Sequence, residues 1–192
     1  VVAVASNSNG MVIGLPAAYA MARHRLTLFA FLMLASRILP AIVFLVPLFI
    51  IYRDLRLINT HLGIIITHII IVLPLIIWIM SGFFQDLPVE LEDSAMVDGC
   101  SRAGAFVRVL LPLSMPGIIA AVILSFIASW NNFIFVLILG GRSTTTLPMA
   151  VYSFMSFEDI NWGGLCAAAT VITLPIIVLS FFVQRQLTGG LT

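Results

Sequence analysis

Long apolar runs separated by short polar segments constrain this chain more than any other feature. Each run is close to the roughly 20 residues that an α-helix needs to cross the hydrocarbon core of a bilayer. Backbone groups inside a bilayer have no water to bond to, so spanning segments of this kind satisfy their hydrogen bonds as helices. Because 61% of the residues are hydrophobic and only 9% are charged, we expect an all-α fold, a polytopic membrane helix bundle.

The runs predict about five spans, given the length that one crossing needs. They cover residues 1–22, 27–52, 61–84, 113–139 and 164–184. Such short connections leave no room for a separate soluble domain, so we expect residues 1–192 to form a single transmembrane domain. Any nucleotide-binding or catalytic domain is then expected on another chain. Since Val1 already lies in an apolar run, we also expect the sequence to begin inside or just before a span.

Charged residues gather in the loop between the third and fourth spans. The segment from Asp86 to Arg108 contains five of the eight acidic residues and two of the nine arginines. Arginines at the span ends number five on the side of this loop and three on the other, and the positive-inside rule therefore places the loop in the cytoplasm. With a net charge of +1 and scattered arginines, the chain offers no basic surface for phosphates, which excludes a nucleic-acid partner.

Turn and capping residues predict two short helices in this loop. Pro88 suits the first position of a helix over about 88–97, and the acidic residues that follow favour the positive end of its dipole. Gly99 supplies the left-handed backbone that a helix end often needs, and Ser101 is placed to cap the second helix. The two helices would form a compact knob. An amphipathic hairpin lying on the membrane surface is the alternative interpretation.

The spacing of residues in this loop closely resembles the EAA loop of ABC importer permeases. Asp93-Ser94-Ala95, three residues, Gly99, nine residues and Val109-Leu110-Leu111-Pro112 keep the whole pattern of EAA, three residues, Gly, nine residues and I-x-L-P. Asp93, Ser94 and Val109 stand in place of glutamate, alanine and isoleucine. Because aspartate is one methylene shorter than glutamate, its contact with a partner would differ in detail.

Segments outside the loop resemble the carbohydrate (maltose-type) branch of these permeases, and within it the second permease subunit. The segment from Ala17 to Arg23 is similar to the AAYALAR sequence of that branch. Further matches occur in the same order along the chain, at Pro47-Leu48-Phe49, Asn59-Thr60, Gly82-Phe83-Phe84, Ser129-Trp130-Asn131-Asn132-Phe133, Thr146-Leu147-Pro148, Trp162-Gly163 and from Gln184 to Thr192.

The resemblance implies a subunit of an ATP-driven sugar importer in a bacterial-type inner membrane. Family members have about six spans, so we expect this chain to lack the first helix and a few residues after Thr192. Implied partners are a cytoplasmic ATPase dimer, a second permease subunit that completes a heterodimer, an extracytoplasmic binding protein that delivers the sugar, and membrane lipid. The chain itself would not be an enzyme and would need no metal or other cofactor.

In this family the loop, here about 85–112, couples the permease to the ATPase. The residues expected to couple to the ATPase are the pattern positions Asp93, Ser94, Ala95, Gly99, Val109, Leu111 and Pro112, together with Phe106 between them. Asp93 offers an acceptor to the partner, and the small residues Ala95 and Gly99 allow close approach. We expect Phe106 and Val109 to supply the apolar anchor that interfaces rely on, and Leu111-Pro112 to tie the knob to the fourth span.

Polar or aromatic side chains in the spans are candidates for a sugar path, because an unsatisfied polar group is costly in lipid. They are Asn7, Asn9, Arg37, His68, Trp130, Asn131 and Asn132. Hydroxyl groups bond well to amides, and an aromatic ring can stack on a sugar ring. The asparagines could equally bond one helix to another. Arg37, near the middle of the second span, is expected to face the translocation cavity or the subunit interface.

Three alternatives follow from the same residues. An ABC permease for a phosphate, polyamine or amino acid would share the EAA pattern. An ion-coupled secondary transporter would need a carboxylate inside a span, and all eight acidic residues fall in predicted loops. A membrane enzyme would need a metal cluster, a nucleophile with its base or paired carboxylates, and no predicted span contains one.

Overall fold

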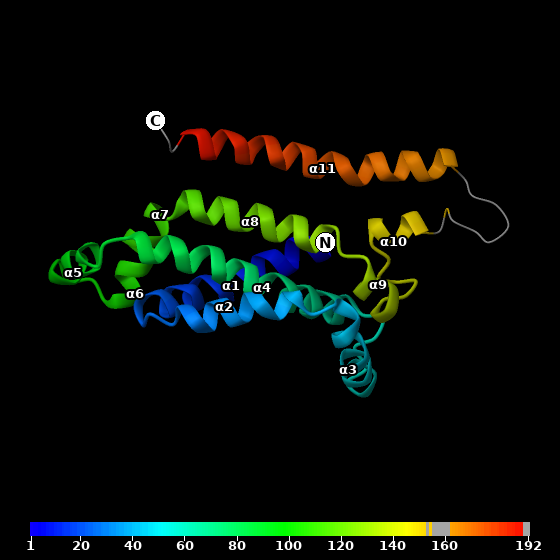
Figure 1. Cartoon of the computed structure of the whole chain (residues 1–192), viewed down its shortest axis with the longest axis horizontal. Coiled ribbons are helices and arrows are strands. Elements are labelled where there is room, and N and C mark those ends of the chain that lie inside the picture. The colour runs from blue at the N-terminus through cyan, green and yellow to red at the C-terminus, as the bar shows by residue number, and fades with distance from the viewer. Residues whose placement is uncertain (153, 155–161, 190–192) are drawn as a thin grey trace.

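The computed structural model describes residues 1–152, 154 and 162–189, with side chains as far as residue 181. Every regular element in this part of the chain is a helix (Figure 1). The all-α prediction is therefore confirmed.

Four helices pack along the long axis of the molecule. They are α1 (Val2–Arg23), α2 (Thr27–Ala35), α4 (His61–Asp86) and α8 (Met115–Trp130). Helix α4 lies at the centre and contacts each of the other three. Helix α11 (Trp162–Gly189) runs beside α8, and α3 (Ala41–Asp54), α9 (Ile134–Leu139) and α10 (Leu147–Tyr152) lie at one end (Figure 1).

The opposite end of the bundle carries a knob, by which we mean the segment from α5 to α7 (Figure 1). It consists of α5 (Glu90–Val97), α6 (Arg102–Ala105), a π-helical turn (Phe106–Leu110) and α7 (Leu111–Leu113). The knob and the cluster of α3, α9 and α10 are thus separated by the length of α4. Any communication between them passes through the long helices.

Helices α1 and α4 approach each other closely because α1 presents glycine at their contact. A Cβ atom added at Gly14 would lie 2.7 Å from Cγ2 of Ile76, and one added at Gly10 would lie 3.1 Å from Val72. Small interface residues let membrane helices gain contact area where apolar burial gives little advantage over lipid. Around this contact Ala18, Ile76 and other buried side chains form the main core.

The predicted second span is not one helix. It divides into α2, a short 3-10 turn (Ser36–Ile38) and α3, and the two arms meet at 92°. Pro40 explains the break, because a residue that precedes proline is forced out of the helical region, and Leu39 is extended with ψ 134°. Arg37 therefore lies in the turn at the bend between the two arms.

The predicted fourth span is also interrupted. Helix α8 ends at Trp130, and α9 begins only at Ile134. Asn131 and Asn132 account for the end of α8, since short amide side chains compete for backbone hydrogen bonds and disfavour helix interiors. A further bend of 78° separates α8 from the end of the knob. The predicted polar loop after this span contains α10.

Within the described residues, two helices have the length and apolar content needed to cross a membrane, at His61–Asp86 and Trp162–Phe181. Counting each bent pair as one span raises the number to four. Helix α1 has 22 residues, but the polar sequence from Ser6 to Asn9 lowers its apolar content. Two of these polar residues, Ser6 and Asn7, form hydrogen bonds to α8.

Candidate functional site

The turn between α5 and α6 has the geometry that its sequence predicts. Gly99 has φ 89°, in the left-handed region that favours glycine. Its N–H donates to Met96 O at 3.1 Å and the N–H of Cys100 donates to Ala95 O at 3.0 Å, which is the Schellman closure of a helix. Ser101 Oγ then accepts from Gly104 N at 3.1 Å and caps α6. Two short helices joined by a tight turn are therefore confirmed.

The outer surface of the knob mixes small polar residues with exposed apolar side chains, among them Val97 and Val107. Asp93, Ser94 and Gly99 are exposed, as is Pro112 at its far end. Ser94 Oγ donates to Glu90 O at 2.7 Å within α5, whereas Asp93 has no side-chain partner among the described residues. The carboxylate of Asp93 is thus available to a donor from outside the chain.

The apolar residues of the predicted docking surface face inward instead. Phe106 packs against Tyr19 and Phe84, with ring centroids 4.8 Å and 5.8 Å apart, and Val109 and Leu111 pack against the same core. Ala95 is buried as well. Phe106 and Val109 are half-buried against their own bundle, and their expected role as an anchor for a partner stays a prediction. They attach the knob to its own bundle.

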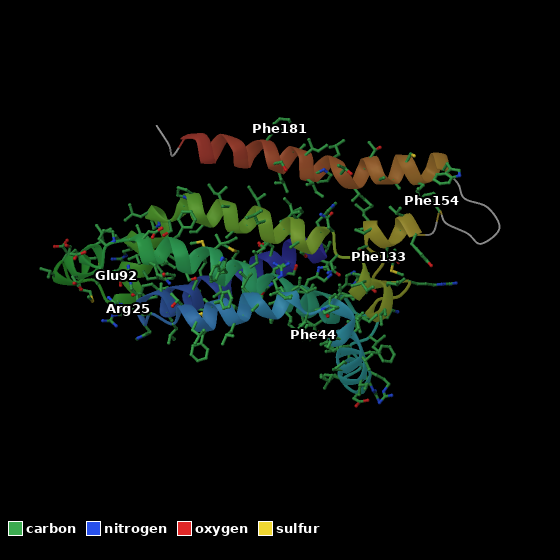
Figure 2. The ribbon with its side chains drawn as sticks, in the orientation of Figure 1. Arg25, Phe44, Glu92, Phe133, Phe154 and Phe181 are labelled. Carbon is green, nitrogen blue, oxygen red and sulfur yellow. The ribbon has the colours of Figure 1, made fainter. Side chains whose placement is uncertain are left out.

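A buried ion pair, which the sequence did not indicate, holds the knob in place. Glu92 lies at the knob end of the bundle (Figure 2), and its carboxylate pairs with Nε of Arg23 from α1. The other carboxylate oxygen accepts from Tyr19 OH at 2.5 Å. The exposed fractions of the two charged side chains are 5% for Glu92 and 16% for Arg23.

Arg23 also caps the C-terminal end of α4. Its Nη1 donates to Phe84 O at 3.0 Å and to Leu87 O at 3.2 Å. These carbonyls belong to the last turn of α4 and its C-cap, where no intrahelical donor is available. One guanidinium thus joins α1, α4 and α5. The signal in the sequence was the spacing of Tyr19 and Arg23, which places both on one face of a helix.

At the opposite end of the bundle, a polar cavity of about 300 Å³ brings together the path candidates His68, Trp130 and Asn132. Phe133, the residue after Asn132, lies at that end (Figure 2). Side chains that the sequence did not single out complete the polar lining. They are His61, Ser129, Thr144, Thr145 and Thr146.

Hydrogen bonds hold His68 and Ser129 in place in the wall of this cavity. Three buried polar atoms of the lining residues have no hydrogen-bond partner among the described residues. His68 is 1% exposed, and its Nδ1 lies 2.7 Å from Ser129 Oγ, which lies 3.0 Å from Ser6 Oγ on α1. The unpartnered atoms are His68 Nε2, Asn132 Oδ1 and Thr146 Oγ1, which are buried and find no hydrogen-bond partner among the described residues.

The remaining path candidates have other surroundings. Asn7 is buried between helices, where Nδ2 donates to Val122 O at 2.7 Å and Oδ1 accepts from Ser125 Oγ at 2.9 Å. Asn9 is exposed and bonds to Ala5 O in its own helix. Asn131 is exposed at the end of α8. Arg37 lines a separate cavity of about 380 Å³ that Asn132 also borders.

The described residues contain no group of three His, Cys, Asp or Glu side chains placed to hold a metal ion. The chemistry that the two sites offer is hydrogen bonding, ion pairing and apolar contact. This is the chemistry of docking and of binding a polar solute.

A polytopic bundle with a fixed two-helix knob at one end and a polar cavity at the other defines a membrane transport permease. Residues 10–191 match the family described as binding-protein-dependent transport system inner membrane component, and the chain belongs to that family. The predicted ABC importer permease and its location in a membrane are thereby confirmed. The match also decides against the ion-coupled secondary transporter.

Relatives in this family include named sugar permeases. The chain is 34% identical over 188 residues to the diacetylchitobiose uptake system permease protein DasC of Streptomyces coelicolor, covering 95% of this chain and 67% of that protein. It is 39% identical over 191 residues to the trehalose transport system permease protein SugB of Mycobacterium tuberculosis, covering 95% and 69%. The chain thus spans about two thirds of the length of these relatives.

The fold agrees with a solved transporter. The crystal structure of a bacterial ABC transporter involved in the import of the acidic polysaccharide alginate contains a chain that matches with a TM-score of 0.72 and 21% identity. The match covers 95% of this chain and 70% of that one. The overall fold of this chain therefore also occurs in a chain of an ABC importer.

Proposed function

We propose that this chain forms half of the translocation pathway of an ATP-driven importer for an uncharged carbohydrate. The diacetylchitobiose and trehalose permeases among its relatives support this substrate class. A second permease subunit would complete the pathway, and an extracytoplasmic binding protein would deliver the sugar. ATP hydrolysis would reside on separate cytoplasmic subunits.

The observation that carries the proposal is the construction of the knob. Its outer face offers the free carboxylate of Asp93 and the bare backbone turn at Gly99, while its apolar face and Glu92 attach it to α1 and α4. A partner that moves the knob must then move the long helices, because a packed interface transmits displacement instead of absorbing it. We assign Asp93, Ser94, Gly99 and Pro112 to contact with the ATPase.

The inward-facing residues have a different part in the same process. Ala95, Phe106, Val109 and Leu111 would pass the movement of the knob into the bundle through their packing on Tyr19 and Phe84. With the knob in the cytoplasm, the cavity beside His68 faces the outside. The sugar would therefore enter at one end of α4 while ATP acts at the other.

Substituting Gly99 tests this docking surface. No atom lies within 4 Å of a Cβ built on Gly99, so the side chain of Gly99→Trp finds space within this chain and projects toward a docking partner. Any residue with a Cβ is also strained at the φ of 89°, which is why a second Gly99 variant is needed beside it. We expect the variant to insert into membranes, to lose ATPase subunits on purification and to lose sugar uptake. Gly99→Asn is the matched control, because asparagine tolerates a positive φ and adds much less bulk.

The wild-type substrate is tested separately, by uptake of radiolabelled trehalose, maltose and diacetylchitobiose into proteoliposomes that contain the whole importer. Import of a phosphate, polyamine or amino acid, with no import of these sugars, would contradict the substrate class. Normal uptake and normal ATPase recovery with Gly99→Trp would contradict the docking surface. The two parts of the proposal can thus fail independently.

A further inference from the structure

The cavity beside His68 has the features of a built binding site. Three residues that line it each carry a buried polar atom with no hydrogen-bond partner among the described residues. These atoms are His68 Nε2 from α4, Asn132 Oδ1 from the segment after α8 and Thr146 Oγ1 from the segment before α10. Buried polar groups without partners are rare because each one loses its hydration without compensation. Three of them around one cavity indicate that a polar ligand completes their hydrogen bonds.

Neutral hydroxyl groups suit these atoms better than charged groups do. The amide oxygen of Asn132 only accepts, whereas the hydroxyl of Thr146 both donates and accepts. None of the described residues that line the cavity is an aspartate, glutamate, lysine or arginine. A carboxylate or phosphate would have no cationic side chain to pair with there, apart from the histidines, so the lining favours an uncharged ligand.

His68 can match either role of a ligand hydroxyl. Its Nδ1 bonds to Ser129, and Ser129 bonds to Ser6, in contacts where the proton can lie on either partner. When Ser129 donates to Nδ1, neutral His68 presents a donor at Nε2; when Ser129 donates to Ser6, His68 presents an acceptor. A sugar hydroxyl, which both donates and accepts, bonds to His68 in both arrangements.

Trp130 provides an apolar wall whose position is fixed from two sides. Its Nε1 donates to Ile172 O of α11 at 3.2 Å, and its ring stacks on Phe126 with centroids 5.4 Å apart. A volume of about 300 Å³ lies at the lower end of the range for small-molecule pockets. The cavity therefore suits one sugar ring, with the rest of an oligosaccharide outside it.

We propose that this cavity is an entry subsite that binds one ring of an uncharged sugar through His68, Asn132 and Thr146, with Trp130 as its apolar wall. The proposal rests on the importer function above and assigns its first contact on the outer side. Asn7, Asn9, Asn131 and Arg37 are not part of this subsite.

The test measures sugar uptake by the whole importer in proteoliposomes, with trehalose, maltose and diacetylchitobiose as probes. Thr146→Val removes the hydroxyl and keeps the shape of the side chain, and Asn132→Ala removes the amide. We expect each substitution to raise the KM for the transported sugar by about 2- to 12-fold, the range for one neutral hydrogen bond. The rise in KM should exceed any fall in maximal rate.

Two further variants separate binding from structure. Thr146→Ser restores the hydroxyl and should return the KM to within about twofold of the wild type, which is less than one hydrogen bond contributes. Thr170→Val is the control, because Thr170 is exposed on α11 and its hydroxyl bonds to Cys166 O in its own helix. An unchanged KM in Thr146→Val and Asn132→Ala, or a lower maximal rate at constant KM, would overturn the subsite. Failure of the wild type to import any of the sugars would instead overturn the proposed function.

Discussion

Replacing Glu92 by glutamine should loosen the knob while leaving its docking surface intact. Glutamine keeps the shape of the side chain and can still accept from Tyr19, but it leaves the guanidinium of Arg23 without its counter-charge. Removing one partner of a buried ion pair destabilises by about 3–5 kcal/mol. Arg23 keeps an exposed fraction of 16% and two carbonyl acceptors, so we expect a value near 3 kcal/mol, the lower end of that range.

Trypsin provides the assay, because Arg102 and Arg108 are exposed on the knob and both are cleavage sites. Cleavage requires local opening, and its rate follows the population of the opened state when closing is fast. A loss of about 3 kcal/mol raises that population on the order of 100-fold. The initial cleavage rate at these two sites in Glu92→Gln, measured in lipid nanodiscs, should increase by a similar factor.

A second acidic residue in the same helix serves as the control. Glu90 is exposed and its side chain has no ion-pair partner among the described residues, so Glu90→Gln should cleave like the wild type. The double variant Arg23→Gln/Glu92→Gln should cleave more slowly than the product of the two single effects predicts, because it leaves no unpaired charge. Cleavage of Glu92→Gln within threefold of the wild type, or simple additivity in the double variant, would refute the reasoning.

Two further substitutions separate local roles. Asn7→Ala removes the two hydrogen bonds that Asn7 forms with α8. It should lower stability by about 0.6–1.7 kcal/mol for each bond, which thermal unfolding would detect. The KM for sugar should stay unchanged, and a raised KM would instead place Asn7 on the path. Ser101→Ala removes the cap of α6 and should cost about 1 kcal/mol, seen as roughly fivefold faster tryptic cleavage after Arg102. Equal cleavage of Ser101→Ala and the wild type would show that the cap contributes nothing measurable.

Local chemistry made the turn of the knob predictable from the sequence. The left-handed conformation of Gly99 and the cap at Ser101 depend on residues within a few positions of each other, and the EAA-like spacing pointed to the same place. Hydrophobic runs likewise located the long helices. Their breaks at Pro40 and Asn131 were harder to predict, because proline and asparagine are also tolerated inside membrane helices when neighbours supply the missing bonds.

Contacts between distant residues explain most of what the sequence did not reveal. Arg23 and Glu92 are separated by 69 positions, and His68 and Ser129 by 61. Glu92 looked like one of several loop acids, and only the packing of α5 against α1 distinguishes it from the exposed Asp93. The periodicity of Phe106 and Val109 predicted an apolar face correctly but could not say whether that face meets a partner or the bundle itself.

Because α4 is one continuous helix, a small tilt at one of its ends displaces the other end. His68 stands near one end of this helix and Phe84, whose carbonyl bonds to Arg23, near the other; at 1.5 Å per residue they are about 24 Å apart along the axis. A tilt of about 5° around the knob end would carry His68 sideways by about 2 Å over that length. This displacement is comparable to the 2.7 Å between His68 and Ser129, so a rotation too small to disturb the packing near the knob would suffice to rearrange the cavity.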